Sequence, residues 1–160
     1  MDSKVKIYKE RANNESRLSS ALFNLSEKEN IKVDLGAEKD DTFYSAAISH
    51  AYYSIFYCAK ALLLTEGIDT KSPEVHKKTF EEFETRFVKS GKLDVALLSI
   101  YKKMIIRADE LLGIFKEEKG KRGDYTYSII PQANREPAQE SINNAKKFLK
   151  HTIAYLERQK

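Results

Sequence analysis

The stretch of residues 43–65 constrains the fold of this chain more than any other. Apart from its tyrosines and one cysteine, its ionisable groups are His50 and Lys60. A helix that is apolar on nearly all of its faces is buried by other elements. A β-strand is excluded by the length, since strands usually run for roughly 4–8 residues. We therefore predict that residues 43–65 form the central helix of an all-α domain.

One face of this predicted helix carries only small side chains at helical spacing. They are Ala47, Ala51, Ser54, Cys58 and Ala61. Small side chains allow a second helix to approach closely, whether it belongs to the same chain or to a second copy. The face therefore predicts a close helix neighbour and favours a homodimer. Because Cys58 lies on it, we expect a packed thiol rather than a nucleophile.

The same stretch is long enough to span a membrane. An imidazole, an amine and several hydroxyl groups fall well inside it, however. Polar and ionisable groups are costly in the hydrocarbon core of a bilayer. We therefore predict a buried helix of a soluble protein and no membrane association.

The composition fits one domain in a reducing compartment. A chain of 160 residues can bury a core without crosslinks, so we expect residues 1–160 to form a single helical domain. The lone cysteine allows no intramolecular disulfide, and the N-terminus carries no apolar leader. Both features favour the cytoplasm. The net charge of +4 permits binding to a polyanion without demanding it.

Other helices are predicted where apolar residues recur every three or four positions. They cover residues 3–28, 73–90, 93–118 and a last segment from Pro137 onward. Residues 29–41 are expected to be a polar connection. The side chains that we expect the first helix to bury are Val5, Tyr8, Ala12, Leu18, Leu22 and Leu25.

Turn residues predict where these helices begin and end. Asp40 or Asp41 is expected to cap the central helix, because a carboxylate can accept the unpaired amides of a first turn. Gly67 is expected to end that helix in the left-handed conformation. Ser72 and Pro73 predict the next start, as the N-cap and the first helical residue.

Residues 120–136 form the longest irregular stretch in the second half of the chain. Gly120 is expected to end the preceding helix, in which Gly113 costs about 1 kcal/mol relative to alanine. A loop of this length inside a compact domain is often functional. Its chemistry-bearing side chains are Lys121, Arg122, Asp124, Tyr125, Tyr127 and Arg135.

These residue types suit a nucleic acid. Arginine and lysine hold phosphate, arginine through two parallel hydrogen bonds, and tyrosine stacks on bases or donates its hydroxyl. The competing interpretation is that Arg122 and Asp124 pair with each other on the surface, since such pairs are common and weak. The sequence leaves both interpretations open.

Other catalytic schemes find little support. The histidines His50, His76 and His151 lack metal-ligand spacing, and no glycine-rich phosphate loop is present. We therefore predict no metal and no cofactor. His50 has no acidic residue one turn away on its own helix, so we expect it to be a hydrogen-bonded structural residue rather than a general base.

The segment Ser45 to Phe56, with its Ala-Tyr-Tyr core, followed by Ala-Lys-Ala-Leu-Leu at 59–63, resembles the signature helix of prokaryotic HEPN-domain proteins. Val-His-Lys at 75–77, the sequence at 87–91 and Gly-Asp-Tyr at 123–125 resemble the same family. The resemblance is strongest over residues 43–155. It implies a four- to five-helix up-and-down bundle that commonly dimerises.

The resemblance also implies a class of function. Many members of the family are metal-independent ribonucleases, and others are nucleotide-binding or inactive partners of a minimal nucleotidyltransferase, often as toxin and antitoxin. The usual motif arginine would stand at position 120, which is Gly120 here. Arg122 is the nearest substitute, with Asp124 and Tyr125 at the end of the motif.

Two functions therefore stay open at this point. In the first, the protein binds RNA or nucleotides and cleaves RNA through Arg122, Asp124 and Tyr125, while Lys121, Tyr127 and Arg135 bind the substrate. In the second, it is a catalytically inactive HEPN interaction module that binds a partner protein. The glycine at position 120 favours the second.

Overall fold

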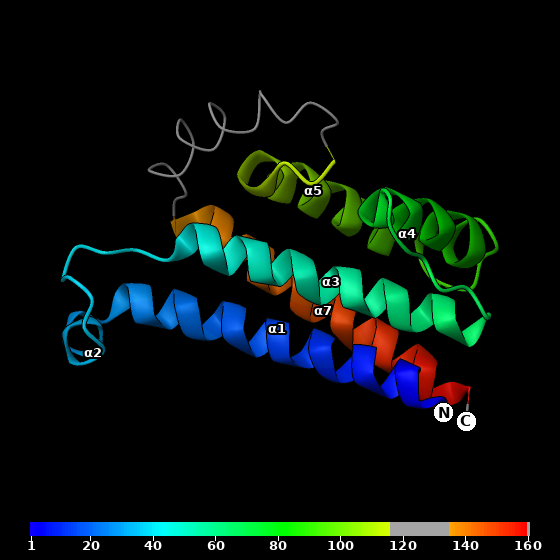
Figure 1. Ribbon diagram of the computed structural model, residues 1–160, viewed down its shortest axis with the longest axis horizontal. Helices are drawn as coiled ribbons and strands as arrows, with labels where there is room; N and C mark the ends of the chain where they lie inside the picture. The colour runs from blue at the N-terminus through cyan, green and yellow to red at the C-terminus, as the bar shows by residue number, and fades with distance from the viewer. Residues whose placement is uncertain (116–134, 160) are drawn as a thin grey trace.

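The structure is a computed structural model that describes residues 1–115 and 135–159. Within these ranges every regular element is a helix, as predicted, and the chain folds as an all-α bundle. Three long helices lie side by side, with both termini at the same end of the bundle, and α4 and α5 cover another side of α3 (Figure 1). The elements are α1 (Ser3–Glu27), α2 (Glu29–Asp34), α3 (Tyr44–Thr65), α4 (Val75–Phe83), the π-helical turn η1 (Glu84–Val88), α5 (Val95–Leu112) and α7 (Arg135–Arg158).

Helix α3 is the centre of the bundle, as the sequence predicts. It packs against α1, α4, α5 and α7, and its apolar side chains form the middle of the main hydrophobic core. No helix within the described residues is both long and apolar enough to cross a membrane. The small side chains of its predicted contact face are all buried: Ala47, Ala51, Ser54, Cys58 and Ala61.

Helix α1 of the same chain packs against part of the small-residue face of α3, at Ala47 and Ser54, while Cys58 on the same face lies beside Thr152 of α7. Two cross-helix hydrogen bonds show how close the backbones come: the Ser54 hydroxyl donates to the Ala12 carbonyl at 2.8 Å, and the Ser19 hydroxyl to the Ala47 carbonyl at 2.6 Å. The predicted close neighbour is therefore confirmed, and it lies within the chain. This face consequently gives no support to a homodimer, which remains an expectation from the family resemblance.

The buried face of α1 differs from the prediction. Val5 and Ala12 are buried, but Leu18 is 38% exposed, while Ser16 and Ser19 are buried in place of leucines. Small serines fit the narrow space against α3, and a leucine would not. The displaced leucines instead line an apolar groove of about 440 Å³ between α1 and α2, together with Ile31 and Leu35 of α2 and its neighbouring turn.

The connection 29–41 contains a helix that the sequence prediction missed, and it changes how α3 begins. Helix α2 places the buried Lys32 ammonium 2.9 Å from the Asp41 carbonyl. The Asp41 carboxylate accepts the Glu38 amide rather than an amide of α3. Phe43 precedes α3 without a side-chain cap, so the predicted capping by Asp40 or Asp41 is wrong. Both acidic residues belong to the turn before it.

The other predicted helix ends are partly correct. Gly67 follows α3 with φ +76°, in the left-handed conformation predicted for it. The start at Ser72 and Pro73 is wrong: Glu74, with φ 55°, precedes α4, which begins at Val75. Helix α5 ends at Leu112 rather than near Gly120, because Gly113 adopts φ 61° and donates its amide to the Asp109 carbonyl. The last helix begins two residues before Pro137, at Arg135.

Candidate nucleic-acid interface

Most of the predicted loop site lies outside the described residues. This applies to Lys121, Arg122, Asp124, Tyr125 and Tyr127, which fall within 116–134. The described residues on either side of that segment do show where it leaves and rejoins the bundle.

Arg135 is the one predicted site residue within the described part of the chain. It is the first residue of α7, and its guanidinium donates to the Glu27 carboxylate. The same guanidinium lies 5.3 Å from the centroid of the Phe23 ring. Arg135 therefore holds the start of α7 against α1, and this contact leaves part of its side chain exposed.

The segment leaves the bundle at Phe115, whose position is fixed by several contacts. Its amide donates to the Asp109 carboxylate at 2.9 Å. Its ring lies 6.4 Å from the Tyr52 ring and 6.0 Å from the His76 ring, both measured between centroids. Arg135 stands beside Phe23, which itself contacts Tyr44 at the first turn of α3. Tyr44 and Tyr52 are the α3 residues near the two ends of the segment. They lie in the first half of α3, roughly 12 Å apart along the helix axis at 1.5 Å per residue.

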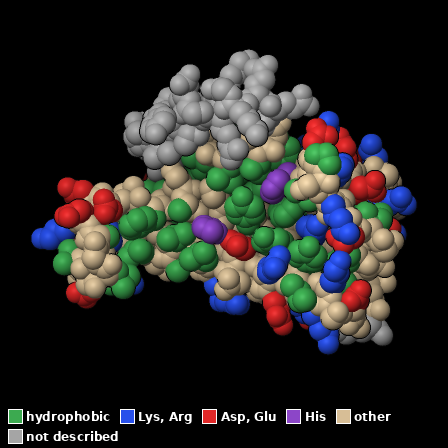
Figure 2. Space-filling model, in the orientation of Figure 1, with side chains coloured by type: hydrophobic (Ala, Val, Ile, Leu, Met, Phe, Trp, Pro, Cys, Tyr) green, Lys and Arg blue, Asp and Glu red, His purple; other side chains and the backbone are tan. Residues whose placement is uncertain are grey.

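A surface with nucleic-acid chemistry lies along the middle of α3 and the first half of α1. We call it the tyrosine–histidine face, and it consists of Tyr8, Arg11, Glu15, His50, Tyr53, Tyr57 and His76. None of these side chains is fully buried. Figure 2 shows two histidine side chains on one side of the molecule, with hydrophobic side chains between them and an acidic one beside the lower histidine.

Helices α1 and α3 contribute matching residues to this face. On α1 they are Tyr8, Arg11 and Glu15, and on α3 they are residues 50, 53 and 57, so each set has a spacing of three and four. Tyr8 pairs with Tyr57, and Glu15 with residue 50, as expected for antiparallel neighbours. The α1–α3 contact therefore fixes the register of the face.

Three tyrosine rings form a row in this face. Tyr8 and Tyr57 stack with centroids 5.8 Å apart, and Tyr57 and Tyr53 stack at 6.4 Å. The Arg11 guanidinium lies 5.7 Å and 5.6 Å from the centroids of Tyr8 and Tyr57, which is cation–π distance. This places a positive charge, phenol groups and ring edges within reach of a single ligand.

His50 contacts a carboxylate that the sequence prediction did not anticipate. Its Nδ1 lies 2.5 Å from Oε2 of Glu15, and the two side chains are 31% and 20% exposed. The predicted hydrogen bond is confirmed. No acidic residue lies one turn away on α3, and the hydrogen-bond partner comes instead from α1.

His76 is the more buried histidine of the face. Its Nδ1 lies 2.8 Å from the Tyr52 hydroxyl, and its ring stacks on Phe56 with centroids 4.3 Å apart. Burial lowers the pKa of His76, and the charge of Lys60 lowers it further. The ring is therefore neutral at pH 7, and it contributes hydrogen bonding and stacking to the face rather than charge.

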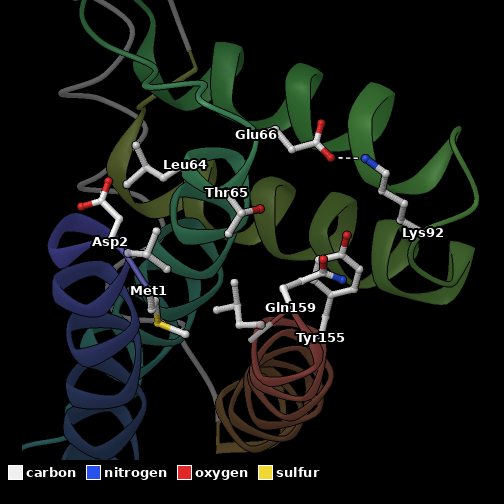
Figure 3. A pocket seen from close by; sticks show the side chains of 10 residues that line it. Met1, Asp2, Leu64, Thr65, Glu66, Lys92, Tyr155 and Gln159 are labelled. Atoms are coloured by element: carbon white, nitrogen blue, oxygen red, sulfur yellow. Dashed lines mark hydrogen bonds and ion pairs between the residues drawn. The ribbon is translucent and has the colours of Figure 1, made fainter.

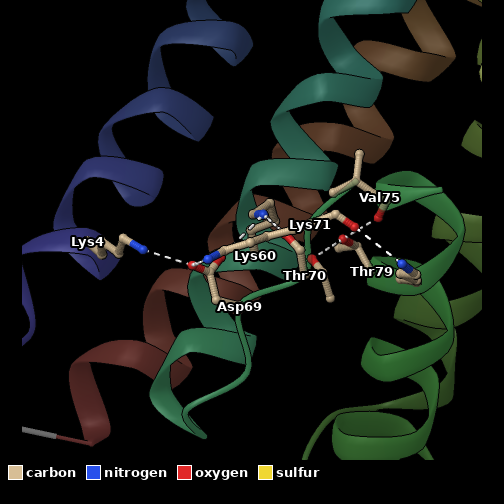
Figure 4. Close-up of polar contacts among 8 residues, drawn as sticks. Lys4, Lys60, Asp69, Thr70, Lys71, Val75 and Thr79 are labelled. Carbon is tan, nitrogen blue, oxygen red and sulfur yellow. Dashed lines mark hydrogen bonds and ion pairs between the residues drawn. The ribbon is translucent and has the colours of Figure 1, made fainter. Parts of the chain in front are cut away.

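A polar network next to the face fixes the C-terminal end of α3 (Figure 4). The buried Lys60 ammonium donates to the Thr70 carbonyl at 2.6 Å and lies 3.6 Å from the Asp69 carboxylate. Lys4 binds the same carboxylate at 2.8 Å. The hydrogen bond from Lys4 holds the pKa of Asp69 below its usual range. This network joins α1, α3 and the turn before α4, and we assign it a structural role.

A pocket of about 620 Å³ opens at the end of the bundle where the termini lie (Figure 3). Its charged side chains already have partners. Glu66 forms an ion pair with Lys92, and Asp2 accepts the Lys4 amide as the N-cap of α1. The tyrosine–histidine face offers more groups that a ligand could contact, so it is the stronger candidate.

Cys58 is a packed thiol, as the sequence analysis predicts. Burial raises the pKa of the Cys58 thiol to about 12, which leaves it protonated and unreactive at neutral pH. Among residues 1–115 and 135–159, no three His, Cys, Asp or Glu side chains are grouped in a way that could hold a metal ion.

The comparisons with known proteins agree with this architecture. The family model described as HEPN domain matches residues 15–154. The chain therefore belongs to the HEPN family, and the matched range contains all of α3 and most of the bundle. It also contains the whole segment that joins α5 to α7.

Individual relatives come from archaea and bacteria. The chain is 32% identical over 71% of its length to "Putative toxin MJ0142" of Methanocaldococcus jannaschii. It is 48% identical over 30% of its length to the UPF0332 protein PH1297 of Pyrococcus horikoshii. It is 29% identical over 69% of its length to a UPF0332 protein of Thermotoga maritima. The chain spans 66%, 32% and 70% of these relatives, respectively.

Proposed function

We propose that this protein is an RNA-binding HEPN toxin that cleaves RNA without a metal ion. The observation that carries the proposal is the tyrosine–histidine face, which contacts Phe115 at one described end of the segment containing Arg122, Asp124 and Tyr125. The toxin name of a relative and the family membership support it. We also propose a homodimer in the cytoplasm that acts on RNA or nucleotides, with a minimal nucleotidyltransferase as its antitoxin partner.

The face and the loop would divide the work of binding. Arg11 offers a cation to a phosphate, and the rings of Tyr53 and Tyr57 offer contacts to unpaired bases or ribose hydroxyls. Lys121 and Tyr127 would add charge and a further ring from the loop. The binding affinity should fall as salt is added, because phosphate contacts release counterions.

Cleavage would use the ribose 2′-hydroxyl of the substrate as the attacking group. Arg122 would stabilise the negative charge that builds on the phosphate in the transition state. Asp124 or Tyr125 would orient the reacting groups or transfer a proton. No step in this scheme requires a metal ion.

The experiment compares the wild-type protein with Arg122→Ala at low salt, using a pool of single-stranded oligoribonucleotides. We expect weaker binding and slower cleavage by the variant, with an unchanged melting temperature, because a loop arginine contributes little to core burial. Arg17→Ala, an exposed arginine on α1 outside the face, is the matched control. Equal behaviour of wild type and Arg122→Ala would remove the loop from the proposed site.

The second candidate function is an inactive HEPN module that binds a partner protein. Gly120, where the family motif carries arginine, favours it. RNA binding separates the two functions: a protein that binds no RNA at low salt, but forms a stable complex with a co-expressed nucleotidyltransferase, would be the interaction module.

A further inference from the structure

We propose that Glu15 and His50 form the proton-accepting pair of the RNA cleavage reaction, with His50 as the base and Glu15 as the residue that positions it. This inference rests on the proposed ribonuclease function, and it replaces the purely structural role that the sequence analysis predicts for His50. It adds two residues that lie far from the loop in sequence and belong to different helices.

When Glu15 is ionised, the geometry of the pair selects one tautomer of the imidazole. Oε2 of Glu15 lies 2.5 Å from Nδ1 of His50. An ionised carboxylate can only accept a hydrogen bond, so Nδ1 carries the hydrogen. In the neutral ring Nε2 is then the unprotonated nitrogen, and it is the one that can accept a proton. A carboxylate that holds an imidazole in this tautomer also stabilises the imidazolium formed when the proton arrives.

The position of the pair allows contact with a substrate. The His50 side chain is 31% exposed, so part of its ring is open to solvent. The ring of Tyr53 lies 6.4 Å from it, between His50 and His76. Phe115, at one described end of the loop segment, contacts Tyr52 two residues after His50 and also His76 of the same face.

The proposed step balances in atoms and charge. Nε2 of His50 takes the proton from the 2′-hydroxyl as the 2′-oxygen forms its bond to phosphorus. The bond from phosphorus to the 5′-oxygen breaks, and that oxygen takes a proton from solvent. The products are a 2′,3′-cyclic phosphate and a 5′-hydroxyl end. The imidazolium then returns its proton to water, which restores the neutral ring.

The test measures cleavage and binding separately with a pool of single-stranded oligoribonucleotides. Binding is measured with 2′-deoxy versions, which lack the attacking hydroxyl. We expect His50→Ala to cut RNA about 10²–10⁴-fold more slowly, with binding changed by less than about twofold, since positioned proton transfer adds to rate and not to ground-state affinity. His151→Gln, an exposed histidine on α7, should cut at the wild-type rate.

Three further measurements distinguish proton transfer from a structural role. Added imidazole should restore part of the rate of His50→Ala without changing its melting temperature. Glu15→Gln should cut about tenfold more slowly or worse, because an amide can donate to Nδ1 and leave the hydrogen on Nε2. Glu15→Asp should recover part of that loss.

Three results would overturn the proposal. If His50→Ala cuts RNA as fast as wild type, the pair is a structural bridge between α1 and α3, and the ribonuclease proposal survives without it. If His50→Ala loses binding and cleavage in equal proportion, the histidine binds substrate only. If the wild-type protein binds RNA and never cuts it, both the pair and the nuclease function are wrong, while RNA binding stands.

Discussion

Two faces of α3 show how one helix can serve both the fold and a candidate site. The face toward α1 carries Ala47, Ala51 and Ser54, which are buried against a helix backbone. The neighbouring face carries His50, Tyr53 and Tyr57, which are larger, polar and half-buried. The first face brings α1 close, and the close approach of α1 in turn places its own polar residues beside the second face.

The tyrosine–histidine face depends on the close packing of α1 against α3. Glu15 reaches His50, and Tyr8 reaches Tyr57, only because the antiparallel helices are in register. The small side chains set the distance and the serine hydrogen bonds to carbonyls set the register. A substitution on the small-residue face should therefore lower stability strongly. A substitution on the tyrosine–histidine face should weaken ligand contacts with little effect on stability.

The largest effect is expected for Ala51→Leu, which would disrupt the small-residue face. Ala51 is fully buried where α1 approaches α3, so the added atoms have no space. We expect the free energy of unfolding to fall by about 2–3 kcal/mol, measured by urea denaturation. Ala46→Leu makes the same change at a half-buried position of the same helix and should lose less than about 1 kcal/mol. Similar losses for the two variants would contradict the distinction between the faces.

The next effect concerns the charged end of α3. Lys60→Met should lower the free energy of unfolding by about 1–3 kcal/mol, because the Thr70 carbonyl loses its donor inside the protein. Lys71→Met is the matched control, since Lys71 approaches the same Asp69 carboxylate at 3.9 Å but is exposed. That variant should change stability by less than about 0.5 kcal/mol. A larger loss for Lys71→Met would show that the surface ion pairs, rather than the buried bond, hold this end.

A third prediction concerns pH. Burial lowers the pKa of His76 in the folded protein below its usual value of 6.5. A base whose pKa is lowered by folding contributes full stability above the unfolded pKa and loses it as the pH falls through the folded pKa. Thermal melts between about pH 7.5 and about pH 5 should therefore show a weaker acid dependence in His76→Gln than in wild type. His151→Gln should keep the wild-type dependence, and identical curves for all three proteins would contradict the prediction.

The smallest expected effect is on RNA affinity. Arg11→Ala should weaken binding of single-stranded RNA several-fold at low salt and reduce the salt slope by about 0.7–1, as expected for the loss of one phosphate contact. Arg17→Ala, on the same helix, should leave both unchanged. A fluorescence anisotropy titration at two salt concentrations measures both quantities. Equal weakening by the two variants would indicate general attraction to a basic helix and no defined face.

The sequence predicted the central helix and its packing face because both depend on local patterns. An apolar stretch of this length and a run of small residues at helical spacing have few other solutions. The buried serines of α1 could not be predicted in this way. Ser16 and Ser19 look polar in sequence and become buried only because α3 fits closely against them and the Ala47 carbonyl accepts the Ser19 hydroxyl.

The site was less predictable for a related reason. The loop residues stand out by their chemistry, whereas Glu15 and His50 are 35 positions apart and meet only through helix register. A signal was present in the sequence: residues 8, 11 and 15 repeat the spacing of residues 50, 53 and 57. It becomes informative only when antiparallel pairing of these two helices is known. His76, the second residue of α4, also could not be placed from sequence, because the turn that precedes α4 brings it to the face.

The most direct test of the central claim uses the three histidines as reporters. Their ring resonances can be followed by NMR while a 2′-deoxy analogue of a single-stranded oligoribonucleotide is added at low salt. The account predicts that the resonances of His50 and His76 shift in a saturable manner, while that of His151, exposed on α7, stays in place. Saturable binding that shifts His151 alone, or leaves all three unchanged, would show that the tyrosine–histidine face is not where RNA binds.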